Sequence, residues 1–225
     1  MATRNPDSPA ARAALAKLCE TYWYPIYAFL RRRNHDRDRA MDLTQELFYQ
    51  MIERRSFEVA DQERGRFRSF LLACLRNLLS HEHHKDQAVK RGGRFSFVPL
   101  DEVVGENRYA AEPADELSPE KLFERRWAMT LIDQAMVALK QEYSESGRAE
   151  LFDALHICLS GSQESSSSYA EIGARLGMSE NAARQAGFRL RTRYGSLLRE
   201  QVAQTVSGPA ELEDELAHLW TVLGS

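Results

Sequence analysis

Arginine side chains recur along the segment 180–199, which also contains one glutamine, Gln185. An arginine can donate two parallel hydrogen bonds to guanine, and a glutamine amide can pair in the same way with adenine. We therefore expect Arg184, Gln185 and Arg189 to face bases and adjacent phosphates. Residues further along are expected to hold backbone phosphates: Arg191, Arg193 and Arg199.

The residues before this basic segment predict a helix-turn-helix. Ser168 and Glu171 have the spacing of a capping box, and Gly177 has the position of a residue that ends the helix. Ser179 is expected to cap the second helix. A helix, a glycine turn and a basic second helix together form the arrangement that places a recognition helix in the DNA major groove. The alternative is a solvated basic face on an ordinary pair of core helices.

Cations and aromatic rings also interleave at 66–77. Opening a duplex needs apolar or aromatic surface for flipped bases and cations for the exposed backbone. The segment offers both over about three helical turns: Arg66, Phe67, Arg68, Phe70, Arg76 and Asn77. At least two of Phe67, Phe70 and Leu71 are expected to belong to the core, whatever the function.

Helical periodicity positions these side chains. Apolar residues at spacings of three and four predict helices over 10–33, 38–54, 66–88 and 119–143, and two or three shorter ones follow within 148–206. Ser118 before Pro119 marks a helix start. The tail is expected to form at most one or two amphipathic turns.

The predicted fold is all-α, with two helical domains joined by an acidic flexible linker rich in Gly and Pro. The second domain contains the helix-turn-helix. The predicted order is a first domain, the linker, the helix-turn-helix domain and an acidic C-terminal tail, at 10–94, 95–118, 119–206 and 207–225.

The bulk composition of the 225 residues, with 43% hydrophobic and 28% charged residues, is that of a globular protein. No apolar run is long enough to span a bilayer, and the first residues lack the apolar core of a signal peptide. A cytoplasmic protein without membrane contact is expected. The formal net charge of −3 argues against a protein that coats nucleic acid by charge alone.

Sequence motifs of catalysis are missing, so no enzymatic activity is predicted. Cys19, Cys74 and Cys158 are too far apart for a CxxC motif. The histidines at 81–84 are close together but lack a fourth ligand at suitable spacing. No metal and no cofactor are expected.

Three motifs resemble the extracytoplasmic-function (ECF) group of the sigma-70 family of bacterial RNA polymerase sigma factors. They are DLTQELF at 42–48, GRFRSFLLACLRNLL at 65–79 and YAEIGARLGMS at 169–179. In that family the first lies on the helix that grips the polymerase clamp, the second opens and reads the −10 promoter element, and the third reads the −35 element. The resemblance implies a sigma factor that binds core RNA polymerase at its clamp and flap regions and directs promoter-specific transcription initiation.

The resemblance also implies three sets of contact residues. Those for the polymerase are Asp42, Leu43, Gln45, Glu46 and Phe48. Those for −10 DNA are Arg66, Arg68, Phe70, Arg76 and Asn77, where Phe70 replaces the usual tryptophan. Those for −35 DNA are Arg184, Gln185, Phe188, Arg189, Arg191 and Arg193. The linker runs near the active-site cleft in that family, so its acidic residues, Glu106 among them, either mimic nucleic-acid charge or form a solvated spacer.

The first motif is short of negative charge. Many relatives carry acidic residues at the positions of Arg39 and Met41, where they face a basic region of the clamp. We hypothesise that the unmodified chain binds core polymerase poorly and that phosphorylation, which adds roughly −1.5 to −2 charges, activates it. Ser56 is the preferred acceptor and Thr44 the second. The sequence leaves open whether a Ser/Thr kinase, an anti-sigma factor or the tail exerts control.

The main alternative is an autonomous helix-turn-helix regulator. Such a protein binds its operator without polymerase and usually as a dimer. DNA binding by the purified chain, with and without core polymerase, distinguishes the two.

Overall fold

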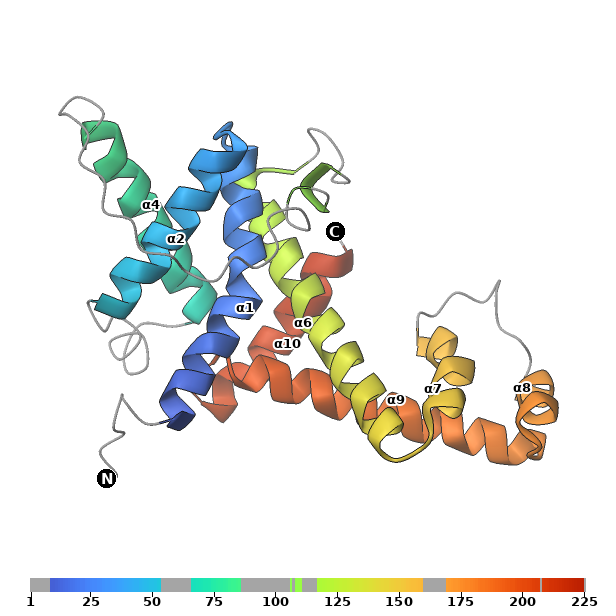
Figure 1. The fold of residues 1–225 in the computed structure, drawn as a ribbon. Helices are drawn as coiled ribbons and strands as arrows, with labels where there is room; N and C mark the ends of the chain where they lie inside the picture. Colours follow the sequence, from blue (N-terminus) through green and yellow to red (C-terminus); the bar gives the residue numbers. More distant parts are fainter. Residues whose placement is uncertain are drawn as a thin grey trace, which may run out of the picture. The chain divides into compact units, whose positions relative to one another are not determined.

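The computed structural model describes residues 9–53, 66–85, 106, 108–110, 117–159, 169–206 and 208–224. Every regular element within these ranges is a helix, which confirms the predicted all-α fold (Figure 1).

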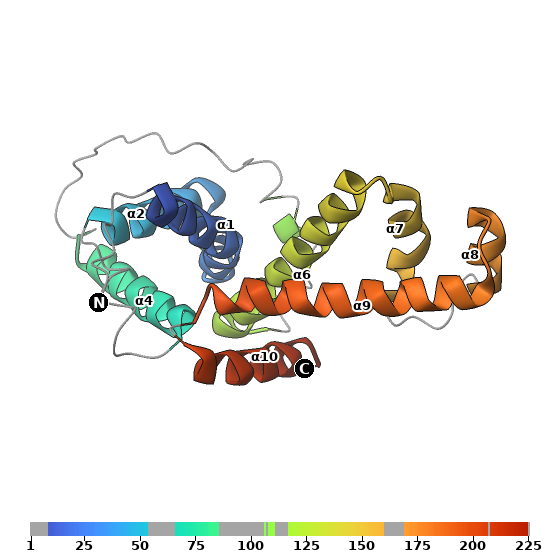
Figure 2. The same ribbon diagram turned by 90° about the horizontal axis from the view of Figure 1, so that it is seen from below.

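The long helices lie close to where periodicity places them. They are α1 (Pro9–Arg32), α2 (Arg37–Glu53), α4 (Phe67–Lys85) and α6 (Pro119–Glu145). Contacts join α1 to α2 and α2 to α4, and the three helices lie side by side in both ribbon views (Figures 1 and 2).

Shorter helices come after α6, and two long ones end the chain. These elements are α7 (Ala149–Leu155), the 3₁₀ turn η1 (His156–Leu159), α8 (Tyr169–Leu176), α9 (Glu180–Ala203) and α10 (Pro209–Gly224). The expectation of only short helices within 148–206 is wrong for α9, which has 24 residues. The tail was expected to form a turn or two, but it forms a 16-residue helix.

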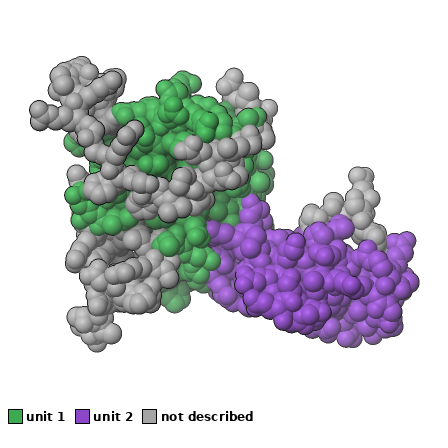
Figure 3. Space-filling model, in the orientation of Figure 1, with its two compact units in different colours: residues 1–130, 203–225 green, residues 131–202 purple. Residues whose placement is uncertain are grey.

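The chain divides into two compact units, coloured separately in Figure 3. Unit 1 comprises residues 1–130 and 203–225, and unit 2 comprises residues 131–202. The sequence-based division placed the first turns of α6 in the second domain and treated the tail as separate. The structure assigns both to unit 1.

The core of unit 1 explains this assignment. Its largest fully buried side chains include Tyr22 of α1, Leu71 of α4, and Phe123 and Trp127 of α6. The ring of Tyr22 stacks on Phe123 with 6.3 Å between centroids. Since the first part of α6 buries its aromatic side chains against α1, this part belongs to the same core.

Unit 2 has its own smaller core. Leu131 and Leu139 of α6 are buried, as are Phe152 of α7, Ile172 of α8 and Leu190 of α9. Each α-helix of the described part of unit 2 thus contributes buried apolar side chains, and α9 has one buried and one solvent face.

Polar caps set the helix starts. The backbone N–H of Lys121 donates to Ser118 Oγ at 3.3 Å, which confirms the predicted start of α6. At the start of α2 the N–H of Arg39 donates to Asp36 Oδ1 at 2.8 Å. Between α1 and α2, Asn34 turns the chain with a φ of 65°, a conformation that asparagine tolerates better than most residues.

Candidate nucleic-acid interface

The turn between α8 and α9 follows from two glycines and a serine. Gly177 has a φ of +66°, and the N–H of Met178 donates to the carbonyl of Gly173 at 2.9 Å, as in a Schellman motif. A Cβ on Gly173 would lie 2.7 Å from the Met178 carbonyl oxygen, so only glycine fits. Ser179 Oγ accepts the N–H three residues on at 3.2 Å. The predicted turn and cap are confirmed, whereas Ser168 lies outside the described residues.

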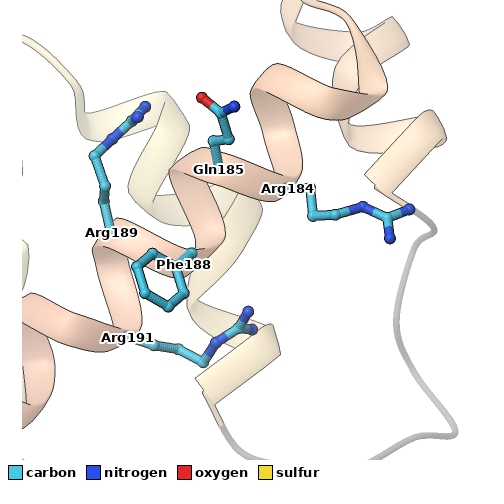
Figure 4. A pocket seen from close by; sticks show the side chains of 5 residues that line it. All are labelled: Arg184, Gln185, Phe188, Arg189 and Arg191. Atoms are coloured by element: carbon cyan, nitrogen blue, oxygen red, sulfur yellow. The ribbon is translucent and has the colours of Figure 1, made fainter.

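The solvent face of α9 gathers five of the six side chains predicted to contact −35 DNA. They line one hollow and extend from the helix in Figure 4: Arg184, Gln185, Phe188, Arg189 and Arg191. All five are exposed, and Phe188 retains 65% exposure. Exposed rings of this size are costly in water. A phenylalanine set among cations and an amide provides apolar and hydrogen-bonding contacts on the same surface.

Tyr169 of α8 orients two of these arginines. Its hydroxyl accepts a hydrogen bond from Arg191 Nη1 at 3.0 Å, and the guanidinium of Arg184 lies 5.8 Å from the centre of its ring. A Cβ on Gly187 would lie 2.9 Å from the same ring, so the small residue lets the tyrosine approach α9. Sequence reasoning missed Tyr169, although its position at the start of the first helix of the motif was a usable signal.

Arg193 was predicted to hold DNA, and in the structure its guanidinium is engaged by two carboxylates of unit 2. Its guanidinium binds Glu142 of α6 at 2.5 Å and Glu200 at 3.0 Å. The hydrogen bond from Arg193 holds the pKa of the Glu142 carboxyl below its usual range, and the two carboxylates raise the pKa of Arg193. Arg193 therefore ties α9 to α6 within unit 2 and is not part of the hollow.

The outer face of α4 carries two of the predicted −10 contacts. Ser69, Ala73, Arg76 and Asn77 are exposed at spacings of three and four, so they share one side of the helix. Arg76 is 56% exposed and lies 3.6 Å from Glu120. This face can offer a cation and an amide to a nucleic-acid strand.

Phe70 occupies an intermediate position. Its ring is half-buried and tilted against Phe67, with 6.2 Å between centroids. Leu71 is fully buried and Phe67 is half-buried against Tyr22. Leu71 thus belongs to the core as expected, and the two phenylalanines line its edge.

Arg68 was predicted to contact −10 DNA, and the structure buries it instead. Its Nε lies 2.6 Å from Glu215 of α10, and its Nη1 lies 2.6 Å from Glu124 of α6. Arg66 is partly exposed and also binds Glu215, at 3.1 Å. The two arginines are therefore drawn toward α10 and do not join the face formed by Arg76.

The α2 face has both surface and core residues among the predicted polymerase contacts. Asp42 and Glu46 are exposed and Gln45 is half-buried. Leu43 and Phe48 are 2% and 4% exposed. The prediction of direct contact is wrong for these two, because they fill the core beneath α2 and cannot meet a partner without opening the domain.

Thr44 is also in the interior. It is fully buried, and its hydroxyl donates to the Ala40 carbonyl at 2.7 Å. A kinase would have to open α2 to reach this oxygen, so the structure argues against Thr44 as an acceptor. Ser56 lies outside the described residues.

Charges of both signs occupy the surface of α2. Arg37, Asp38, Asp42 and Glu46 are exposed, whereas Arg39 is half-buried. Met41 lies at the edge of the core with 9% exposure. The surface therefore carries mixed charge at the start of α2 and acidic charge further along.

Glu106 of the linker is tied to α1. Its carboxylate lies 2.7 Å from Arg31 Nη2 and accepts a short hydrogen bond from the Tyr27 hydroxyl. The Arg31 guanidinium holds the pKa of this carboxyl below its usual value. Arg108 stacks on Tyr24 in the same region, 4.6 Å from the ring centre. Glu106 is thus a structural contact, and the other acidic residues of the linker lie outside the described residues.

No local sequence pattern predicted the pairing of Glu215 with Arg66 and Arg68. Glu215 is separated from Arg68 by 147 positions, and it reads in sequence as one acid among several in the tail. Its 1% exposure distinguishes it from those neighbours.

Among the described residues, no helix is long and apolar enough to cross a membrane. No group of three histidine, cysteine, aspartate or glutamate side chains in the same part of the chain could hold a metal ion.

The first helices match a known family. Residues 18–89 match the family model of sigma-70 region 2, a span that contains α2 and α4 and most of α1. Comparison with curated proteins and with solved structures found no significant match. The match covers the residues that carry the predicted polymerase and −10 contacts.

Proposed function

We propose that the chain, whose residues 18–89 match the model of sigma-70 region 2, is a sigma-70-family sigma factor that binds core RNA polymerase and selects promoters of its own. The match to sigma-70 region 2 supports a role in transcription initiation, and no enzymatic activity is proposed. The ECF group is the one that the sequence motifs suggest. The observation that supports promoter selection is a second surface suited to bind DNA. This surface is on α9 and lies outside the matched residues.

Polymerase binding is assigned to the exposed side of α2. Asp42, Gln45 and Glu46 offer two carboxylates and an amide on successive turns, and these groups suit a basic partner surface. Leu43 and Phe48 contribute indirectly, because their burial fixes the rotation of the helix. The clamp is the proposed partner of this face, and the flap region is the proposed partner of unit 2.

Promoter contacts are assigned to two helices. The outer face of α4, with Arg76 and Asn77, is proposed to meet the −10 element. The face of α9 that carries the hollow is proposed to enter the major groove at the −35 element. There Gln185 could hydrogen-bond to adenine, Arg189 to guanine, and Phe188 could contact a thymine methyl group. Arg184 and Arg191 are held by Glu180 and Tyr169 at the edges of the hollow, which suits phosphate contact.

Control by phosphorylation is also proposed. Arg37 is exposed and Arg39 half-exposed at the start of α2, and both would repel a basic clamp surface. A phosphate on Ser56, shortly after α2, would supply the missing negative charge. Neither the kinase nor an anti-sigma factor is identified by the described residues, and Ser56 remains the preferred acceptor because Thr44 is buried.

Co-purification with core RNA polymerase tests the proposed function. The full chain and the double variant Asp42→Ala/Glu46→Ala are each mixed with core polymerase and separated by gel filtration. At high protein concentration the wild type is expected to co-elute, and the double variant to lose most of its affinity. The variant Glu171→Ala removes an exposed acid from α8 and serves as the charge control. Specific binding of the wild type to a palindromic site without polymerase would contradict the proposal.

The switch is tested separately on Ser56. Ser56→Glu is expected to co-elute with core polymerase at lower protein concentration than Ser56→Ala. Equal elution of the two variants would remove Ser56 from the proposal while leaving polymerase binding intact.

A further inference from the structure

The C-terminal helix α10 is held on unit 1 by few apolar contacts. Among its described side chains only Glu215 and Leu219 are buried, and Trp220 is 56% exposed. The remaining leucines of the helix are half-buried: Leu212, Leu216 and Leu223. A helix with so little buried apolar surface depends on its polar contacts for its position.

The shortest polar contacts described between α10 and the rest of the chain are made by Glu215, while His218 lies 3.5 Å from Glu124 of α6. The two carboxylate oxygens of Glu215 lie 2.6 Å from Arg68 Nε and 3.1 Å from Arg66 Nε. The carboxylate of Asp214 forms a longer ion pair with Arg66, at 3.9 Å. Both arginines stand at the N-terminal end of α4, beside which α10 runs in Figure 2. One carboxylate therefore bridges two guanidinium groups from the helix proposed to meet the promoter.

A phosphate group can take the same place. Arginine makes charge-assisted hydrogen bonds of similar geometry to carboxylates and phosphates. A buried ion pair contributes little net stability relative to apolar packing, because both charges lose their water. The contact is therefore specific without being a strong attachment, and a backbone phosphate, which carries the same single negative charge, can displace it.

We propose that α10 competes with promoter DNA inside the chain, with Glu215 occupying an Arg66–Arg68 site that takes a backbone phosphate once α10 leaves. The inference rests on the proposed function, because it takes α4 as the helix that meets the opened promoter strand. Since α10 is covalently linked, it competes at high effective concentration. The isolated chain thus keeps its region 2 arginines covered until another contact, such as that with polymerase, favours the open form.

The test measures binding of a fluorescein-labelled mixed-sequence single-stranded DNA to the full chain by anisotropy. Glu215→Gln removes the bridging charge, and Leu219→Asp removes the main apolar anchor at a different point of α10. Both are expected to bind about tenfold more tightly than the wild type at low salt. Two added phosphate contacts should also steepen the slope of log affinity against log salt by about 1.4.

The matched control is Glu213→Gln, which removes the same charge from an exposed position of the same helix. Its affinity is expected to stay within about twofold of the wild type, as a single exposed charge has little effect at moderate salt. Adding Arg66→Gln to Glu215→Gln should return about half of the change in salt slope, since one of two phosphate contacts is lost.

A purely structural role for α10 predicts the opposite result. In that case Glu215→Gln and Leu219→Asp lower the stability of unit 1, but their DNA affinity and salt slope equal those of the wild type. This result overturns the proposal. Circular dichroism and co-elution with core polymerase are recorded for every variant. Wild-type chain that fails to co-elute even at high protein concentration counts against the proposed function, whereas co-elution with unchanged DNA affinity counts against the inference alone.

Discussion

The two groups of arginines proposed to meet DNA are held in opposite ways. On α9, Arg184, Arg189 and Arg191 are exposed around one hollow. At the start of α4, Arg68 is buried and Arg66 is partly covered, and both are bound to Glu215 of α10. The arginines around the hollow on α9 face solvent, whereas those at the start of α4 are already paired with an acid of α10.

The difference comes from the position of the acidic residue with which each arginine pairs. Arg184 pairs with Glu180, one turn earlier on the same helix, at 2.7 Å, and both side chains stay in water. Such a pair contributes a few tenths of a kcal/mol and yields easily to a phosphate. Arg68 pairs with acids from two other helices, and its charge leaves water completely. The role of an arginine in this fold thus depends on whether its partner is local or remote.

The largest predicted effect is at the covered group. Arg68→Met leaves Glu215 buried without its main partner, and the expected loss is about 3–5 kcal/mol in the free energy of unfolding of unit 1. Urea denaturation followed by tryptophan fluorescence measures it, because Trp23, Trp127 and Trp220 all belong to unit 1. Arg184→Met, the exposed counterpart, is expected to change stability by about 0.5 kcal/mol or less.

The double variant Arg68→Met/Glu215→Leu sharpens this test. Replacing both partners with apolar groups removes the unpaired charge, so most of the lost stability should return. Equal stability of Arg68→Met and wild type would mean that the buried pair is not a coupled unit, and the contrast between α4 and α9 would fail.

This contrast also marks how far the sequence predicts the structure. The glycine turn at Gly177 and the caps at Ser118 and Ser179 were predicted, because each depends on residues within one helical turn. The burial of Arg68 and the pairing of Arg193 were not, since their partners lie 147 and 51 positions away. Periodicity identifies the apolar face of a helix, but it does not tell which charged residues of the other face another helix will cover.

The next effect concerns the geometry that keeps the α9 face open. Gly173→Ala places a Cβ 2.7 Å from the Met178 carbonyl oxygen, and backbone on both sides cannot move aside cheaply. Overpacking of this kind costs about 1–3 kcal/mol, so unit 2 should melt earlier and bind promoter DNA less well. Thermal unfolding by circular dichroism and a gel shift with holoenzyme measure the two effects.

Gly195→Ala is the matched control for Gly173→Ala. A Cβ at Gly195 meets nothing within 4 Å in the middle of α9. The substitution is expected to stabilise the helix by about 0.5–1 kcal/mol. A loss of stability as large as that of Gly173→Ala would show that the close turn is not the cause.

A smaller effect tests which DNA feature Phe188 contacts on the exposed face of α9. Phe188→Ala should leave stability nearly unchanged because the ring is 65% exposed, yet it should weaken discrimination at one thymine by about 1 kcal/mol. Promoter duplexes in which deoxyuridine replaces thymine one position at a time remove only the methyl group. Wild type should lose affinity at one such position and Phe188→Ala at none. If both proteins respond alike, Phe188 does not contact a methyl group.

The smallest predicted effect belongs to the covered arginine of unit 2, Arg193. Its hydrogen bond holds the pKa of Glu142 below the usual value, so the ionised carboxylate stabilises the folded unit above its unfolded pKa. That stability is lost as the pH falls through the lowered folded pKa. Because the Glu142 side chain is 40% exposed, solvent screening limits the gain to about 0.5 kcal/mol. Glu142→Gln should therefore lower the melting temperature of unit 2 slightly at pH 7, and the difference should vanish under strongly acidic conditions. A difference that persists there would mean that packing of the side chain, and not its charge, joins α6 to α9. In that case Arg193 would act through packing and Arg68 through charge, so the two arginines would stabilise their units by different interactions.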